Sequence, residues 1–234
     1  YGVGWTSAEF LPQERQLFGL PGGFMNDWAL MTNIPGLFVA GDSLFSSNCY
    51  GHAAATGHYA GRHAADYALE NSLHAICREQ VERDRQRVYG PLKSDGDVGW
   101  KELNEAICKT MQNYCGEVKL DELLQSGVDQ LSHYEKEIVP CAFASNPHEL
   151  MRLIEVEDIL TVAQLILQAC LARRQDCPKL EFYRADGRPQ KPFLVIRHDG
   201  DGTVCREVRL DFAGDVRESY EKLNESYVKE AGRC

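Results

Sequence analysis

Hydrophobic positions in the middle of the chain recur at helical spacing. Between residues 72 and about 175, apolar side chains repeat every three or four positions, which is typical of amphipathic helices that share one core. Pro91 and the polar run at 93–97 separate the first helix from the second. The apolar positions that predict the first three helices are Leu73, Ile76, Cys77, Val81 and Val88; Trp100, Leu103, Ile107, Met111 and Tyr114; and Leu120, Leu124, Val128, Leu131 and Ile138.

The fourth helix has the clearest start signal in the chain. Asn146 suits the N-cap, Pro147 suits the first helical position, and Glu149 completes a capping box. The pattern predicts that this helix runs to about Arg174. Because residues 159–171 are apolar on most faces, we expect this helix to lie at the centre of a bundle.

The N-terminal part follows a different pattern. Residues 1–35 are irregular, and the apolar run 36–42 predicts a short buried strand that ends in a glycine turn. The next segment, 53–68, predicts a helix with one face of small residues, which indicates close packing against a sheet or a flat cofactor. These small residues are Ala54, Gly57, Gly61, Ala64, Ala65 and Ala68.

After Pro178 the hydrophobic period becomes that of strands. Residues 193–196 and 203–210 predict two strands, and the Asp-Gly-Asp-Gly run at 199–202 predicts the turn of a β-hairpin. That acidic turn lacks the further oxygen ligands of a calcium loop. A final helix is predicted at 215–229. The fold class is therefore mixed α+β, mostly α, with a helical bundle and a small β tail.

Charge and cysteine content restrict the classes of partner and compartment. The chain of 234 residues has a formal net charge of −10, which argues against nucleic acid and anionic membranes as partners. No apolar run reaches the length of a membrane span. Its nine cysteines form no C-x-x-C pair, which predicts reduced thiols in a cytoplasmic protein and no structural metal. The first residue is Tyr1 and no signal peptide is present, so we expect a fragment.

The unit that best suits a ligand is the strand end, the following loop and the start of the small-residue helix. The Asp42 carboxylate can accept hydrogen bonds from polyol hydroxyls. The free N–H groups that begin the helix near Gly51 and His52 suit a carbonyl or an anion. Small residues there let a planar ligand approach the backbone. A tight turn with close packing and no ligand is the alternative.

The same residues resemble a known family. The sequence IPGLFVAGD at 34–42 resembles the PGLFAAGE/D segment of the succinate dehydrogenase/fumarate reductase flavoproteins, which include the α subunit of adenylylsulfate reductase. GGFMN at 22–26 is similar to the family's GGI-x-x-N element, and 51–57 falls where its last flavin-binding helix begins. Residues 75–175 resemble its C-terminal helical domain, and 182–186 resemble its H-Y-R-x-D stretch.

This resemblance implies the C-terminal part of an FAD-dependent oxidoreductase. Residues 1–71 would end the FAD-binding domain, 72–177 would be the helical bundle domain, and 178–234 the hairpin tail with its terminal helix. Asp42 would hold the ribityl chain, and the N–H groups of Ala53 and Ala54 would face the N1–C2=O edge of the flavin, where donors favour negative charge on the reduced ring. The implied cofactor-binding residues are Gly41, Asp42, Gly51, His52, Ala53 and Ala54, and His52 is also the candidate catalytic residue.

Departures from the family pattern bear on the substrate and on the cofactor site. Phe18 stands where the family has a substrate-binding histidine, and Asn48 stands near the position of its substrate-binding arginine. Without those cationic groups a dicarboxylate loses charge-assisted bonds, which argues against succinate or fumarate and favours the adenylylsulfate reductase-like branch. The chain also lacks the G-x-G-x-x-G turn that binds ADP in the family, so its flavin site is incomplete and the chain is expected to be inactive alone.

Two hypotheses follow from these observations. In the first, the chain belongs to a flavoprotein that passes electrons between a substrate and FAD, with an iron–sulfur subunit as the partner implied by the resemblance. In the second, the chain is a helical interaction module or scaffold without redox activity, which binds a partner protein through the acidic surface of residues 72–175. Only the first hypothesis requires the Gly41-Asp42 pair to precede a helix whose first turns carry small residues.

Overall fold

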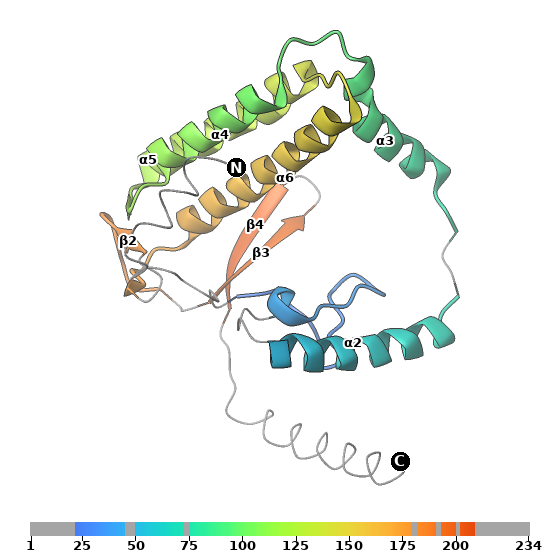
Figure 1. The fold of residues 1–234 in the computed structure, drawn as a ribbon. Helices are drawn as coiled ribbons and strands as arrows, with labels where there is room; N and C mark the ends of the chain where they lie inside the picture. Colours follow the sequence, from blue (N-terminus) through green and yellow to red (C-terminus); the bar gives the residue numbers. More distant parts are fainter. Residues whose placement is uncertain are drawn as a thin grey trace, which may run out of the picture. The chain divides into compact units, whose positions relative to one another are not determined.

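A computed structural model describes residues 22–44, 50–72, 75–178, 182–190, 193–199 and 202–208. The chain divides into two compact units between Cys77 and Arg78. The first unit holds a short looped segment and helix α2, and the second holds the helical bundle with a β-hairpin (Figure 1).

The looped segment of the first unit forms an irregular antiparallel pair. Isolated bridges join Asn26 to Thr32 and Met31 to Phe38, and the Val39 N–H donates to the Leu30 carbonyl at 2.9 Å. The predicted regular strand at 36–42 is therefore wrong, although Val39 is buried. A fully buried strand needs hydrogen-bonded strands on both edges, and in the described part of this unit only residues 30–32 pair with it as a strand would.

Helix α2 (Tyr50–Glu70) confirms the predicted small-residue helix. Its C-terminal half contacts the loop, since the ring of Tyr67 packs edge-on against Phe38 with centroids 6.1 Å apart. Within α2 only Ala60 is buried. Apart from the adjacent residues and the backbone of α2 itself, no heavy atom of the described structure lies within 4 Å of a Cβ added at Gly57 or Gly61. The close packing expected of this face is therefore not made by the described residues.

The second unit contains the four predicted helices in order. Helix α3 begins at Arg78, later than predicted, and Ile76 is 80% exposed in the segment before it. The predicted apolar face from Leu73 is wrong, because α3 itself is highly charged and buries no residue; Leu73 lies outside the described residues. The helical elements are α3 (Arg78–Tyr89), η2 (Gly90–Lys93), α4 (Trp100–Tyr114), α5 (Asp121–His133), η3 (Tyr134–Ile138), η4 (Val139–Cys141) and α6 (Pro147–Ala172).

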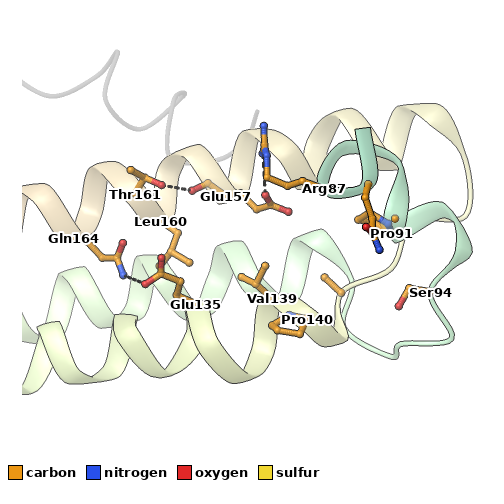
Figure 2. Close-up of a pocket in the computed structure, with 13 residues that line it drawn as sticks. Arg87, Pro91, Ser94, Glu135, Val139, Pro140, Glu157, Leu160, Thr161 and Gln164 are labelled. Atoms are coloured by element: carbon orange, nitrogen blue, oxygen red, sulfur yellow. Dashed lines mark hydrogen bonds and ion pairs between the residues drawn. The ribbon is translucent and has the colours of Figure 1, made fainter. Parts of the chain in front are cut away.

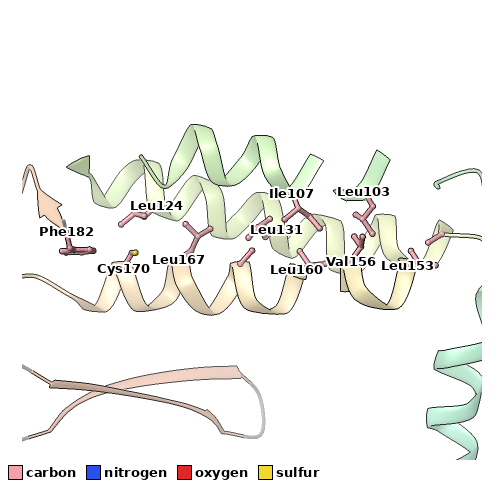
Figure 3. Close-up of a cluster of buried hydrophobic side chains, with 12 residues drawn as sticks. Leu103, Ile107, Leu124, Leu131, Leu153, Val156, Leu160, Leu167, Cys170 and Phe182 are labelled. Carbon is pink, nitrogen blue, oxygen red and sulfur yellow. The ribbon is translucent and has the colours of Figure 1, made fainter. Parts of the chain in front are cut away.

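The core lies between α6 and the pair α4 and α5 (Figure 3). Gly127 of α5 allows the three helices to approach closely, because an added Cβ would lie 2.9 Å from Tyr114 Cβ and 3.0 Å from Leu167 Cδ1. The buried hydrophobic side chains that the three helices contribute to this core are Leu103 and Ile107; Leu124 and Leu131; and Leu153, Val156, Leu160, Ala163, Leu167 and Cys170.

The start of α6 has the predicted cap. Asn146 Oδ1 accepts the Glu149 N–H at 3.0 Å. The Glu149 carboxylate accepts from the N–H and hydroxyl of Ser145, one residue earlier than the capping box predicts, at 2.9 and 2.6 Å. The helix ends at Ala172, two residues before the predicted end, and Arg173 is extended.

Two strand pairs complete the second unit. Strands β3 (Phe193–Asp199) and β4 (Gly202–Val208) form the predicted antiparallel hairpin, in which Asp199 pairs with Gly202. The two predicted turn residues between them lie outside the described residues. The hairpin packs on the face of α6 opposite α4 and α5, so α6 is central as predicted (Figure 3). The parallel pair β1 (Val118–Lys119) and β2 (Tyr183–Arg184) was not predicted. The helix predicted at 215–229 lies outside the described residues.

Truncation of a core leucine should destabilise the helical unit. Leu167 of α6 is fully buried against α4 and α5, so Leu167→Ala is expected to lower the free energy of unfolding by about 2–5 kcal/mol through lost burial and the cavity left behind. Leu165→Ala, on the same helix but 37% exposed, is the matched control and should cost much less. Urea denaturation followed by circular dichroism measures both; equal losses would contradict the packing described.

Candidate functional site

The Gly41 turn is held against the first turns of α2. Gly41 is buried, adopts φ +61, and begins the 3-10 turn η1 (Gly41–Ser43). Its N–H donates to Thr56 Oγ1 at 2.9 Å, and the Thr56 hydroxyl donates to the His52 carbonyl at 2.7 Å. The His52 Nε2–H donates to the Gly41 carbonyl at 3.2 Å. These bonds fix the turn beside the helix start, and glycine is favoured there because a side chain would strain the left-handed backbone.

The structure brings some of the predicted cofactor-binding residues together. Gly41 and His52 are in hydrogen-bond contact, and a Cβ added at Gly41 would lie 3.6 Å from Ala53 Cβ. Asp42 lies in η1 with an exposed side chain. The remaining residues, Gly51, Ala53 and Ala54, are exposed at the beginning of α2. The bond to Gly41 gives His52 a positioning role in the turn, while a catalytic role stays a prediction.

The local chemistry fits a planar ligand with acceptor atoms. The N–H groups of the first turn of a helix have no intrahelical acceptor, and the first turn of α2 carries no acidic residue to compete for them. The open surface over Gly57 leaves room for a flat group along the helix. Phe18 and Asn48, the positions at which the chain departs from the family's substrate-binding residues, lie outside the described residues.

A buried arginine, Arg184 of β2, organises one end of the second unit. Its side chain has no exposed surface. Nη1 donates to the carbonyls of Cys170 and Arg173 at 2.9 and 3.2 Å, while Nε and Nη2 donate to the two Asp186 oxygens at 2.8 and 2.7 Å. Nη2 also donates to Asp121, the first residue of α5. One guanidinium therefore ties β2 to the ends of α5 and α6.

Asp121 accepts from two arginines at this end of the bundle. Arg174 donates to Asp121 Oδ2, so the carboxylate bridges Arg174 and Arg184. The hydrogen bonds from Arg174 and then from Arg184 lower the pKa of Asp121 from 3.8 to about 2. Sequence reasoning placed Arg174 at a helix end and missed Arg184. The R-x-D spacing of Arg184 and Asp186 was visible, but the contact with Asp121 spans 63 residues.

A cavity of about 480 Å³ lies between α3, η2, the η3–η4 turns and α6 (Figure 2). Arg87 reaches the Glu157 carboxylate at 3.4 Å, and Gln164 donates to Glu135 at 2.8 Å. Burial raises the pKa of Glu157, although Arg87 acts in the opposite direction. The carboxylates of Glu157 and Glu135 already have side-chain partners. These residues therefore form polar contacts between neighbouring helical elements. Sequence reasoning did not find this cavity, because its walls come from segments up to 78 residues apart.

The described residues contain neither a metal-ligating cluster nor a membrane-spanning helix. No group of three or more metal-ligating side chains occurs in the described ranges. In the same part of the chain, no helix is both long and apolar enough to cross a membrane.

The helical bundle with its hairpin has the fold of the C-terminal helical domain of fumarate reductase flavoproteins. In sequence, residues 104–179 match the family described as "Fumarate reductase flavoprotein C-term", which confirms the family resemblance at this level. The matched segment contains α5, α6 and most of α4, and therefore nearly all of the core.

Individual relatives extend this similarity beyond the matched segment. The chain is 25% identical over 169 residues to a fumarate reductase flavoprotein subunit of Serratia sp., which covers 66% of the chain and 28% of the relative. A subunit of the same description from Mycobacterium tuberculosis is 22% identical over 220 residues, or 84% of the chain and 38% of the relative. The chain thus spans about a third of the length of these relatives.

A solved structure shows the same fold. The structure described as quinol-fumarate reductase with menaquinol molecules has a TM-score of 0.69 and 22% identity to this chain. The match covers 82% of this chain and 37% of the other. At this identity the likeness concerns the fold.

Asp121 should make stability depend on acid pH. Its folded-state pKa lies below its ordinary value, so its contribution is present above about pH 4 and is lost as the pH falls toward 2. Asp121→Asn should therefore lower the urea midpoint at pH 6, and the difference from wild type should shrink as the pH approaches 2. Because Asp121 is 41% exposed, solvent screening keeps the difference modest.

The control for this pH dependence is Asp129→Asn on the same helix, where the carboxylate accepts from Gln125 instead of arginine. At pH 6, the urea midpoint of Asp129→Asn should differ less from that of the wild type than the midpoint of Asp121→Asn does. If the difference in urea midpoint between Asp121→Asn and the wild type stays constant from pH 6 to 2, the ion-pair assignment is contradicted.

Proposed function

We propose that this chain is the C-terminal part of an FAD-dependent oxidoreductase flavoprotein subunit and contributes the segment that contacts the ribityl chain and the flavin ring. The fold and the match at residues 104–179 support the flavoprotein class. The observation that carries the site is the Gly41 turn, bonded to Thr56 and His52 beside an exposed helix start that bears small residues.

Each residue of this segment has a defined role in the proposal. The Asp42 carboxylate accepts hydrogen bonds from ribityl hydroxyls, and the free N–H groups of the first turn of α2, at Gly51 and His52, donate to an acceptor edge of the ring. Ala53 and Ala54, whose N–H groups donate within the helix, contribute small side chains that let the ring approach. Thr56 and His52 hold Gly41 so that its backbone stays close to α2. When bound, FAD supplies the two-electron redox chemistry, and this chain binds and orients the cofactor.

The rest of the cofactor site lies outside this chain in the proposal. The chain contains no G-x-G-x-x-G turn for the ADP half of FAD. We therefore propose that flavin is retained when this chain is joined to a dinucleotide-binding portion, and that this chain alone is inactive. The same proposal includes an iron–sulfur subunit as electron partner. It also includes membership of the adenylylsulfate reductase-like branch and a cytoplasmic location.

Flavin retention tests the proposed site. In the flavoprotein that carries this chain, Asp42→Ala and Ala53→Trp are expected to weaken FAD binding at least about 10-fold, because one removes a charged acceptor and the other fills the helix start. The FAD absorption that remains after gel filtration measures the effect. Leu69→Trp, near the end of α2 and 87% exposed, controls for an added indole and should keep wild-type flavin.

The same experiment separates the redox proposal from a scaffold without cofactor. A wild-type protein that shows no flavin absorption after incubation with FAD would overturn the redox proposal. Wild-type flavin content in both Asp42→Ala and Ala53→Trp would leave a flavoprotein but remove this segment from its site.

The substrate is proposed to differ from that of the curated relatives. Phe18 and Asn48 replace cationic residues that the family resemblance places against a dicarboxylate. The flavin-loaded protein should therefore oxidise a reduced viologen dye with fumarate at least about 100-fold more slowly than a fumarate reductase assayed beside it, because two charge-assisted contacts are absent. Rates within 10-fold of each other would contradict this part of the proposal.

A further inference from the structure

Two cysteines face each other at the end of the bundle. Cys115 is the C-cap of α4, and Cys170 lies in the last turn of α6. Their Sγ atoms are 4.0 Å apart. Cys170 is 9% exposed, whereas Cys115 is half-buried and reaches solvent. We propose that Cys115 and Cys170 form a thiol–disulfide exchange site that reacts with small-molecule disulfides and closes into an intramolecular disulfide.

The reaction proceeds in two exchange steps. The Cys115 thiolate attacks one sulfur of the small disulfide, whose S–S bond breaks and releases one thiolate. Cys170 then loses its proton and attacks the Cys115 sulfur of the mixed disulfide, which releases the second thiolate. The two protein thiols lose two electrons and two protons in total, and the small disulfide becomes two thiols. The second step is intramolecular, which favours closure over a lasting mixed disulfide.

The surroundings of the pair suit these two roles. The hydrogen bond from the Cys170 thiol lowers the pKa of Cys115 to about 6, and the Lys119 ammonium also favours its thiolate. The hydrogen bond with Cys115, and then burial, raise the pKa of Cys170. The reactive and more accessible thiol is thus Cys115, and the buried Cys170 is placed to resolve the mixed disulfide.

The position of the pair couples it to the Arg184 cluster. The carbonyl of Cys170 accepts from Arg184 Nη1 at 2.9 Å, and Cys115 is followed after two residues by β1, which pairs with β2 at Arg184. A bond between the two sulfurs would close a loop across 55 positions of the sequence and join the ends of α4 and α6. Oxidation would therefore stabilise this end of the bundle through restriction of the unfolded chain.

Peptide mapping of the purified chain tests the proposal directly. After incubation with glutathione disulfide and alkylation of the remaining thiols, trypsin releases residues 110–119 and 153–173, each with a single cysteine. These two peptides should be recovered cross-linked, with two hydrogens lost. The oxidised chain should melt about 5–10 °C above the reduced chain.

Three variants give the controls. Cys115→Ser should leave Cys170 unmodified and remove the thermal shift, while Cys170→Ser should accumulate the mixed disulfide at Cys115. Cys108→Ser removes an exposed thiol of the same helix and should keep both the cross-link and the shift. Glutathione attached only at Cys108 or the other exposed thiols, with residues 110–119 and 153–173 recovered separately, would overturn the proposal. The outcome does not depend on flavin, so it stands apart from the proposed function.

Discussion

The burial of one face of α6 against α4 and α5 is the constraint on which the second unit depends. Leu153, Leu160 and Leu167 pack against α4 and α5, and the β3–β4 hairpin lies against the opposite face of the helix. Apolar side chains elsewhere on α6 stay partly exposed, among them Ile159 at 44% and Val162 at 53%. The hairpin therefore covers α6 only in part, and most of the hydrophobic stabilisation of this helix comes from the face toward α4 and α5.

Polar contacts at the C-terminal end of α6 then fix how the chain leaves the bundle. Arg184 satisfies the carbonyls of Cys170 and Arg173 that the helix end leaves without intrahelical donors, and it pairs with the carboxylates of Asp121 in α5 and of Asp186, two residues along the chain. Because a buried guanidinium is stable only when its donors are used, this contact orders β1 and β2. The facing thiols of Cys115 and Cys170 lie at the same end, so a bond between them would act beside the Arg184 cluster.

The first unit differs from the second, because the described residues do not pack against the small-residue face of α2 at Gly57 and Gly61. The Gly41 turn is closely bonded to α2, yet the small-residue face of that helix is open at Gly57 and Gly61. This open face, together with the fold of the helical domain, supports the proposal that the chain contributes part of a flavin site.

Sequence by itself determined the local elements: the helices at 100–114 and 147–172, the Asn146 cap and the hairpin turn near 200 all follow from spacing between neighbours in the chain. It also indicated Gly41 and the start of α2 as the candidate site through a recognisable motif. Tertiary structure alone decided that 36–42 is no regular strand, that Arg184 meets Asp121, and that Cys115 faces Cys170. The physical reason is that helix periods and caps depend on residues close together in the chain. The contacts of Arg184 with Asp121 and of Cys115 with Cys170 join residues at least 55 positions apart. Whether 36–42 forms a regular strand depends on which segments lie beside it.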